Sequence, residues 1–348
     1  MLEETSNLWR SLPCVCFLVF SSPRLYLVDG HGGREVARFV ENWLPREAAR
    51  LGDAKDLKNS MIQLYNRMDD MLRDAESRDE LKSYKPVPTP GLEGGQNARA
   101  LSMLQGSIQT DLQELREKKG QISRDDASQV MMKMMFLRRL EHQIGGGDSS
   151  SSNAEANIAD TAGCTAVSVL ITPTEFVIAN AGDSRAVLCR GGHTVALSED
   201  HKPNDERESA RILKAGGTVE ESQGGARTHY RVNGNLNLSR AIGDLEYKKN
   251  PSLQHDEQII TSTPDVLCVP RSEDDEFIVL GCDGVWDVLT NDDCVQLVRS
   301  RLAEGKDLKE ICEEIADECL SPDPKATQGL GADNITCIIV DVRNPSSQ

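Results

Sequence analysis

Aromatic residues and positive charge are both scarce in this chain of 348 residues. Phe, Tyr and Trp together make up 4% of it, so a core built from its 38% hydrophobic residues must be mainly aliphatic. Acidic residues outnumber basic ones, 56 to 39, and the formal net charge is −17. Counterion release from nucleic acid and attraction to an anionic membrane surface both require basic side chains. The composition therefore argues against a nucleic-acid partner and against an anionic bilayer.

Paired cysteines and membrane-spanning runs are also missing. None of the ten cysteines belongs to a CxxC pair, and several lie inside apolar runs, where a thiol behaves as a small hydrophobe. The apolar stretch "LPCVCFLVF" has about nine residues, whereas a helix that spans a bilayer needs about 20. The acidic "MLEETSN" before it is unlike a signal peptide. We therefore expect free thiols, no membrane span and a cytoplasmic location, a nuclear one, or both.

The order of predicted elements is that of an α+β chain with one insertion. Residues 25–33 form an apolar strand that ends in an acidic, glycine-rich loop, and residues 34–44 form a helix with one apolar face. Residues 69–158 contain Pro/Gly-rich and Ser-rich linkers, which we interpret as an insertion or lid outside the core. From residue 163 onward, short β-rich runs predict antiparallel strands, and amphipathic helices are predicted near the C-terminus.

Four separate apolar runs, each predicted as a strand, lie next to a carboxylate and small residues. The first is "LYLVDGHGG", where Asp29 and His31 stand among glycines. The others are found in "VIANAGD", "FIVLGCDGVWD" and "ADNITCIIV". If these strand ends converge, their side chains form a cluster of hard oxygen ligands. The acids concerned are Asp29, Asp183, Asp283, Asp287 and Asp333.

Carboxylates that converge repel one another and need a cation. Ligation through oxygen alone suits Mg²⁺ or Mn²⁺, and neither the histidines nor the cysteines show zinc spacing. Two such ions would activate a water and neutralise a phosphoryl group, and His31 could protonate a leaving alkoxide. Taken singly, each acid is more simply interpreted as a turn residue, and Asp287 as a first-turn helix acid. His31 alone could be a loop histidine, so the interpretation depends on the whole set.

The longer motifs resemble the metal-dependent protein Ser/Thr phosphatases of type 2C. They occur in the order "VDGHGG", "TAGCTAVSVLI", "VIANAGDSRAVLCRGG", "LSEDHKPNDERESARILKAGGTV", "RVNGNLNLSRAIGDLEYK", "ITSTPDV", "FIVLGCDGVWDVLTNDD" and "GADNITCIIV". The resemblance covers residues 25–45 and about 160–343, and motifs of this length and order are specific. It implies a single catalytic domain, residues 1–348, folded as a four-layer α-β-β-α sandwich of two antiparallel sheets flanked by helices.

The resemblance also implies roles for individual residues. Two ions, Mg²⁺ or Mn²⁺, would bind in a cleft at one end of the sandwich, with Asp29 bridging both and His31 acting as the general acid. Asn334 would lie beside the cleft, and the segment after "RVNGNLNLSRAIGD" would form part of a flap on the substrate side. The implied metal ligands are Asp29, Gly30 through its carbonyl, Asp283 and Asp333, with Asp183 and Asp287 at the positions of a weaker third ion.

The chain departs from this family at its N-terminus, where it is divergent or truncated. Before the first Asp-Gly-His, family members carry an arginine that grips substrate phosphate and a Met-Glu-Asp motif whose Glu binds the second metal. Only 28 residues precede Asp29, and Glu3 and Glu4, their only acids, lack a matching context. Arg10 and Arg24 match no motif. We therefore expect the second metal to bind weakly and the phosphate clamp to be impaired.

Three functions remain open on the sequence alone. The chain could hydrolyse phosphoserine and phosphothreonine in proteins through a metal-activated water, or it could be a catalytically weak relative that binds phosphoproteins or regulators. It could also be a metal hydrolase that acts on a small phosphate ester. The acids together with His31 favour an active centre, whereas the missing Glu favours the second function. Only the resemblance indicates phosphoprotein partners, and we expect a monomer.

Overall fold

The structure is a computed structural model that describes residues 16–21, 24–50, 55–85, 157–224, 227–323, 326–327 and 329–343. The chain divides into two units, residues 1–85 with 157–348, and residues 86–156. Every element described below belongs to the first unit. The second unit lies outside the described residues, as does most of the expected insertion at 69–158.

The first sheet is antiparallel throughout, and short β9 (Ile242–Gly243) pairs with one of its central strands, β3. Its spatial order is β1 (Cys16–Ser21), β2 (Arg24–His31), β3 (Gly163–Ile171), β4 (Glu175–Ala181) and β10 (Asp265–Pro270). Strand β2 is apolar without alternation because both of its faces are buried. Tyr26 and Val28 pack on the helix side, whereas Leu25 and Leu27 pack toward the second sheet.

The second sheet is also antiparallel, and a separate two-stranded hairpin lies apart from it in the pairing pattern. The sheet order is β12 (Cys337–Asp341), β11 (Asp275–Gly281), β5 (Arg185–Arg190) and β6 (His193–Ala196). The hairpin consists of β7 (Val219–Gly224) and β8 (Arg227–Val232). It follows α6 (Glu206–Lys214) along the chain, and both precede the β9 segment.

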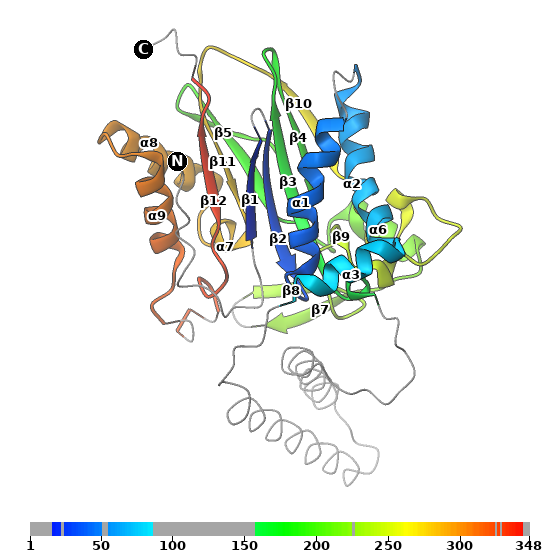
Figure 1. Cartoon of the computed structure of the whole chain (residues 1–348). Coiled ribbons are helices and arrows are strands. Elements are labelled where there is room, and N and C mark those ends of the chain that lie inside the picture. The colour runs from blue at the N-terminus through cyan, green and yellow to red at the C-terminus, as the bar shows by residue number, and fades with distance from the viewer. Residues whose placement is uncertain are drawn as a thin grey trace, which may run out of the picture. The chain divides into compact units, whose positions relative to one another are not determined.

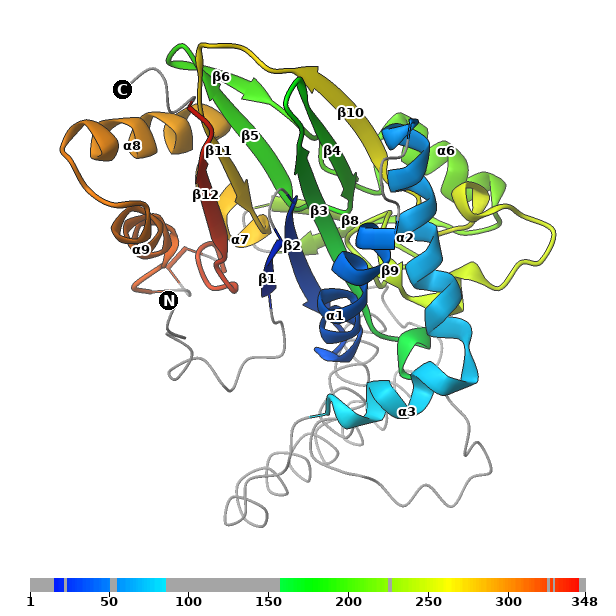
Figure 2. The ribbon, with the colours of Figure 1, turned by 45° about the horizontal axis from the view of Figure 1, so that its top comes forward.

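Helices cover the outer face of each sheet (Figures 1 and 2). The helices on the first sheet are α1 (Glu35–Arg50), α2 (Leu57–Arg73) and α3 (Ala75–Ser83). Those on the second sheet are α7 (Asp283–Trp286), α8 (Asn291–Ala303) and α9 (Leu308–Cys319). The described residues also include 3-10 turns: η1 (Ile158–Asp160) precedes β3, and η2 (Leu245–Lys248) and η3 (His255–Glu257) lie between β9 and β10. The predicted four-layer sandwich is confirmed.

Three apolar layers hold the sandwich together, and they are mainly aliphatic, as the composition predicts. The central layer lies between the sheets and includes Leu27 and Val167 from the first and Leu188 and Ile278 from the second. The two outer layers join each sheet to its own helices. Burial of this apolar surface is the main favourable term in folding, so the ends of the strands are fixed by the core behind them.

The insertion predicted at residues 69–158 begins too early in that prediction. Residues 69–85 are the end of α2 and the whole of α3, and they belong to the first unit. Met68 and Asp69 are fully buried. One turn earlier on α2, the hydroxyl of Tyr65 lies 2.9 Å from Ser168 Oγ and donates to the Ala179 carbonyl at 3.0 Å. An insertion that starts at residue 69 is therefore wrong, and one within residues 86–156 stays a prediction.

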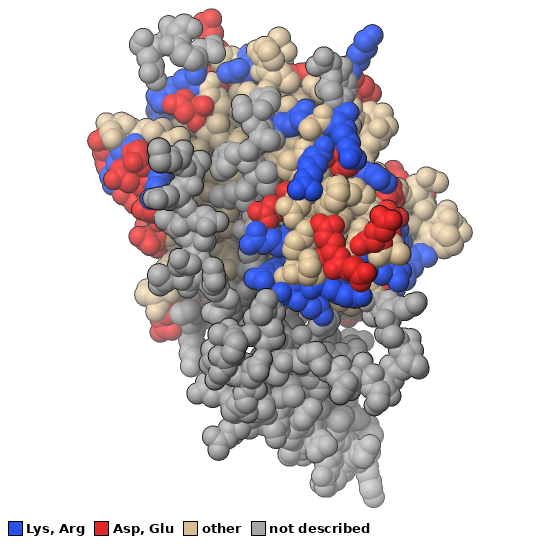
Figure 3. Space-filling view, in the orientation of Figure 1, with Lys and Arg blue, Asp and Glu red and all other residues tan. Residues whose placement is uncertain are grey.

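Charged residues of both signs alternate across the face of the molecule shown in Figure 3. Local ion pairs include Arg38 with Glu41 on α1 and Arg301 with Glu314 between α8 and α9. Within the described part of the chain, no helix combines the length and the apolar character that crossing a bilayer would require.

Candidate metal centre

Strand β2 carries three of the predicted site residues at its C-terminal end. Asp29, Gly30 and His31 all pair with β3, so the strand continues for three residues into the stretch where we expected a loop. The strand ends at His31, and Gly32 follows it with a φ of 71°, which suits glycine. A Cβ at Gly32 would lie 2.4 Å from the Thr161 carbonyl oxygen, so the turn allows no side chain there. The pairing fixes Asp29 and His31 more firmly than a loop would.

Asp283 reaches the same region from the second sheet. It is the first residue of α7 and is separated from the end of β11 by Cys282. Next to it, a Cβ on Gly284 would lie 2.1 Å from the Asn334 carbonyl oxygen, so the loop before β12 packs closely on the start of α7. That loop also carries Asp333, whose side chain is exposed and accepts a hydrogen bond from the Asn334 backbone N–H at 2.8 Å.

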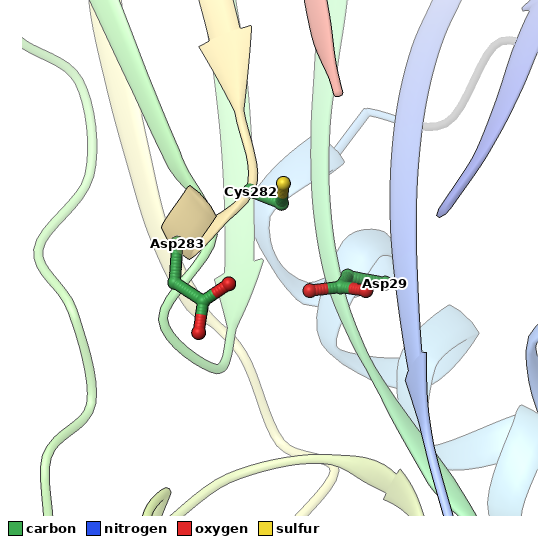
Figure 4. A group of neighbouring side chains, drawn as sticks. All are labelled: Asp29, Cys282 and Asp283. Atoms are coloured by element: carbon green, nitrogen blue, oxygen red, sulfur yellow. The ribbon is translucent and has the colours of Figure 1, made fainter. Parts of the chain in front are cut away.

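The two sheets bring Asp29 and Asp283 together. Their carboxylates point toward one another across the gap between the strand ends (Figure 4). One oxygen of each lies within 4.8 Å of the other and of Cys282 Sγ. The thiol of Cys282 donates to the Asn334 carbonyl at 3.2 Å and accepts from the Thr336 N–H at 3.3 Å, so its hydrogen bonds serve to hold the loop. Oxygen donors from Asp29 and Asp283 therefore face the gap.

Burial and neighbouring carboxylates both disfavour the charged form of Asp283, which is half-buried. Burial raises the pKa of Asp283 to about 9, and nearby carboxylates add to the effect. In order of importance they are Asp183, Asp29 and Asp333, while Lys202 opposes them. Asp283 is thus held between three other acids, each of which comes from a different part of the chain. A cation placed among them would relieve the repulsion, and the donor set fits a hard divalent ion such as Mg²⁺ or Mn²⁺.

Asp183 and Asp287, the expected ligands of a third ion, are placed differently from each other. Asp183 follows β4, is 3% exposed, and accepts a hydrogen bond from Lys202 Nζ at 2.6 Å. The neighbouring carboxylates raise the pKa of Lys202 although burial alone would lower it. Asp287 caps the C-terminal end of α7 and is exposed. An ammonium group of the chain itself therefore occupies one side of the expected third site.

His31 is paired with an acid that the sequence analysis left without a role. Its Nε2 lies 2.6 Å from Asp244 Oδ2, and Asp244 is 3% exposed. Burial lowers the pKa of His31, but the Asp244 carboxylate outweighs burial and the pKa is raised above its usual value. Asp244 belongs to the motif "SRAIGD" and Lys202 to "DHKP". Both motifs were noted, yet neither spacing indicates which side chain the residue would contact.

Comparison with known proteins settles the family. The family model described as "Protein phosphatase 2C" matches residues 99–327. "Probable protein phosphatase 2C 58" of Oryza sativa subsp. japonica is 35% identical over 322 residues, which cover 92% of this chain and 76% of that protein. The chain belongs to the protein phosphatase 2C family. The members of this family are metal-dependent phosphatases that generally use Mg²⁺ or Mn²⁺.

Other relatives agree with this assignment over shorter or more divergent matches. "Protein phosphatase 2C homolog 2" of Saccharomyces cerevisiae is 49% identical over 184 residues, which cover 52% of this chain and 38% of that protein. Among solved structures, "Crystal structure of a phosphatase from a pathogenic strain Toxoplasma gondii" aligns with a TM-score of 0.56 at 18% identity, over 95% of this chain and 93% of that one. At that identity the likeness shows the fold alone.

Proposed function

We propose that this protein phosphatase 2C chain hydrolyses phosphoserine and phosphothreonine in proteins with the help of divalent ions bound at Asp29, Asp283 and Asp333. The observation that carries the proposal is the state of Asp283. Its carboxyl is half-buried near three other acids, and burial together with these acids raises its pKa to about 9. Buried charges in proteins are normally paired with a counter-charge or coordinate a metal, so an arrangement of this kind calls for a cation from outside the chain.

The proposed ligands divide unequally between two ions. Asp29 would be shared, Asp283 with Asp333 would complete the first site, and the Gly30 carbonyl would serve the second. For the second site, family members use a Glu from the strand before the Asp-Gly-His motif. Strand β1, which pairs with β2, has the sequence "CFLVFS" and offers no carboxylate. Because affinity for these ions depends on the number of carboxylates, we propose one tightly bound and one weakly bound ion.

The side chains of the centre would share the chemistry with the ions. When bound, a divalent ion supplies positive charge to the phosphoryl group and lowers the pKa of an attacking water. His31 would donate a proton to the oxygen that leaves phosphorus. The Asp244 carboxylate raises the pKa of His31, which keeps more of the imidazole protonated near neutral pH. Asp183 and Asp287 would bind a third ion only where the Lys202 ammonium leaves its hydrogen bond to Asp183.

The test compares two substrates with and without metal. Turnover of p-nitrophenyl phosphate and of a phosphothreonine peptide should require Mn²⁺ and should stop when a chelator is added. His31→Gln should reduce turnover of the peptide much more than that of p-nitrophenyl phosphate, because a good leaving group needs little help from an acid. Turnover that survives the chelator would contradict the metal centre, and equal losses on both substrates would contradict the role of His31.

A second function is favoured by one observation, the absence of both an arginine and an acid from strand β1. A chain that lacks the phosphate-gripping arginine and one metal ligand could bind phosphoproteins with little turnover. Calorimetry with a phosphothreonine peptide would distinguish the two functions. Micromolar binding without measurable hydrolysis at any Mn²⁺ concentration would favour the regulatory module, and hydrolysis that rises with Mn²⁺ would favour the enzyme. Gel filtration would test our proposal that the chain is a monomer.

A further inference from the structure

Asp244 lies in the interior directly against His31, although the two residues are separated by 213 positions in the chain. The distance from His31 Nε2 to Asp244 Oδ2 is 2.6 Å, and the Asp244 side chain is 4% exposed. A short hydrogen bond between an imidazole and a buried carboxylate fixes the orientation of the ring and selects which ring nitrogen carries a proton. The question is whether the surrounding structure is arranged to maintain this contact.

The backbone at Asp244 adopts an unfavourable conformation that aims its carboxylate at His31. Its φ of 48° and ψ of 43° lie in the left-handed region, which residues other than glycine seldom occupy. Asn233 is the other non-glycine residue with positive φ among those that the structure describes. The Asp244 backbone N–H donates to the Ala162 carbonyl at 3.0 Å, which holds the loop against the start of β3. Such conformations persist only where neighbouring contacts impose them.

Gly163 provides the space in which the two side chains meet. It pairs with His31 on one side and with Gly243 on the other, so it lies between the two segments that carry the pair. A Cβ on Gly163 would lie 2.3 Å from Asp244 Oδ2 and 2.8 Å from His31 Nε2. Any side chain at this position would therefore push the carboxylate away from the imidazole.

A buried ion pair holds the loop on both sides of Asp244. Asp69 of α2 accepts a hydrogen bond from the Gly243 N–H at 2.8 Å and pairs with Lys248 Nζ at 2.6 Å. Lys248 also donates to the Ala241 carbonyl at 2.7 Å. Both charged side chains are almost inaccessible, at 0% and 2% exposure. Gly243, immediately before Asp244, and Lys248, four positions after it, thus both bind the carboxylate of Asp69.

We propose that Asp244 is a positioning residue that keeps the proton on Nε2 of His31, so that the proton given to the leaving group comes from Nδ1. The proposal rests on the proposed role of His31 as general acid. As the bond from phosphorus to the ester oxygen breaks, that oxygen takes the Nδ1 proton and becomes a hydroxyl. The imidazole is left neutral, with its Nε2–H still donating to Asp244. The attacking water loses one proton, and His31 regains one from solvent, so the cycle balances.

The first test measures the tautomer and does not depend on activity. In Mg²⁺ buffer at a fixed pH, the nitrogen chemical shifts of ¹⁵N-labelled histidine should show a protonated Nε2 in the neutral form of His31. In Asp244→Asn, an amide N–H can donate to Nε2, so the proton should move to Nδ1 in a substantial fraction of molecules. A wild-type protein that carries its proton on Nδ1 would overturn the proposal whether or not the variant folds.

The second test uses the leaving group. Asp244→Asn should lower kcat on a phosphoserine peptide by about 100-fold, the smaller end of the range for general acid catalysis, with KM nearly unchanged. Its kcat on p-nitrophenyl phosphate should stay within about threefold, because that leaving group needs little protonation. Glu246→Gln is the matched control, since it removes one exposed charge from the same loop. It should behave like the parent on both substrates.

The outcomes separate this proposal from the proposed function. Substrate-selective loss in His31→Gln together with an unaffected Asp244→Asn would overturn the positioning role alone. Equal losses on both substrates in His31→Gln would overturn the general acid and this proposal with it. Gly163→Ala, which places a methyl group between the two side chains, should reproduce the selective loss of Asp244→Asn, and full peptide turnover in that variant would count against the contact.

Discussion

Two groups of acids in this protein are surrounded in opposite ways. Glu208, on α6, is 1% exposed and accepts hydrogen bonds from Arg240 Nη2 and Arg211 Nη1, each at 2.6 Å, and from Ser239 Oγ at 2.7 Å. Burial alone would raise its pKa, but the arginines lower it well below the usual value. Asp283 is half-buried, its neighbours are mainly other carboxylates, and burial and these carboxylates together raise its pKa to about 9.

This difference in surroundings separates an acid that the chain itself neutralises, Glu208, from an acid that we propose binds an added cation, Asp283. A buried charge is costly to desolvate, and the cost is offset where the chain provides a counter-charge of its own. At Glu208 that counter-charge is built in, so the group needs nothing from outside. At Asp283 the cation that opposes the rise in pKa, Lys202, is hydrogen-bonded to Asp183. We therefore propose that the acids around Asp283 form a centre that is complete only with added positive charge.

The largest effect that would sharpen this comparison is the loss of activity in Asp283→Asn. A bound metal supplies several kcal/mol of transition-state stabilisation, so kcat/KM for p-nitrophenyl phosphate with Mn²⁺ should fall more than about 1000-fold. Asp317→Asn removes an exposed acid from α9 and should keep the activity of the parent. Near-normal turnover in the Asp283 variant would mean that the metal binds elsewhere.

The same variant should change the pH dependence of stability in the metal-free protein. Because the folded pKa of Asp283 is about 9, the folded chain holds a proton that the unfolded chain releases near its usual pKa. Its contribution to the free energy of unfolding therefore falls as the pH rises between these two values. Urea unfolding without metal between about pH 5 and pH 8 should show a shallower decline for Asp283→Asn than for the parent. Parallel declines would show that the proton is not held.

Removing the ion pairs of Glu208 should destabilise the fold. Glu208→Gln leaves Arg240 and Arg211 without their buried partner and should lower the free energy of unfolding by about 3–5 kcal/mol, as measured in urea. The lowered pKa of Glu208 adds stability above its usual pKa, and this stability is lost as the pH falls through the folded pKa. Glu206→Gln, exposed on the same helix, should change stability by less than about 0.5 kcal/mol. An unchanged urea midpoint in Glu208→Gln would contradict the claim that the ion pairs of Glu208 stabilise the fold.

A smaller effect is expected at Lys202, a cation of the chain that acts on the acids around Asp283. Its ammonium stabilises Asp183 in the position proposed for a third ion. Lys202→Met should therefore bind an additional Mn²⁺ about tenfold more tightly, because one positive charge beside a carboxylate is lost. Free Mn²⁺ can be counted by its electron paramagnetic resonance signal. Lys214→Met, an exposed change of the same charge on α6, should leave the titration unaltered. Identical titrations of all three proteins would remove Asp183 from the third site.

The smallest effect should come from the segment 86–156, which lies outside the first unit. We propose that it is an insertion, although the family match begins within it, at residue 99. Replacement of the segment by a short Gly/Ser linker should leave cooperative unfolding and turnover of p-nitrophenyl phosphate close to those of the parent. A broad, non-cooperative unfolding curve would show that the segment belongs to the core.

Local patterns predicted much of the sandwich. The apolar runs around residues 163–196 became β3, β4, β5 and β6, and the two C-terminal amphipathic patterns became α8 and α9. The helix expected to end before Pro45 instead continues to Arg50, because the apolar face that includes Leu44 and Ala48 stays buried past the proline. A proline is a strong local stop signal, and here tertiary packing outweighed it. The stacking of the two sheets was predicted only from the family resemblance.

The candidate centre was predictable to the extent that its residues end strands. Asp29 and Asp283 each follow a buried run and meet where the two sheets end. Asp244 and Lys202 could not be assigned, since their partners are set by contacts over 213 and 19 positions rather than by a local period. Nor does any spacing in α2 indicate that Asp69 pairs with Lys248 in the interior. Long-range polar pairs depend on the completed fold, which short patterns do not encode.

Isothermal titration of the metal-free protein with Mn²⁺ tests most directly whether the acids around Asp283 form a centre completed by divalent ions. Three carboxylates serve the proposed first site, and only the shared Asp29 with the Gly30 carbonyl serves the second. The account predicts one tight binding event, a second that is weaker, and loss of the tight event in Asp283→Asn with the Asp317→Asn control unchanged. A native titration that matches that of Asp283→Asn would contradict it.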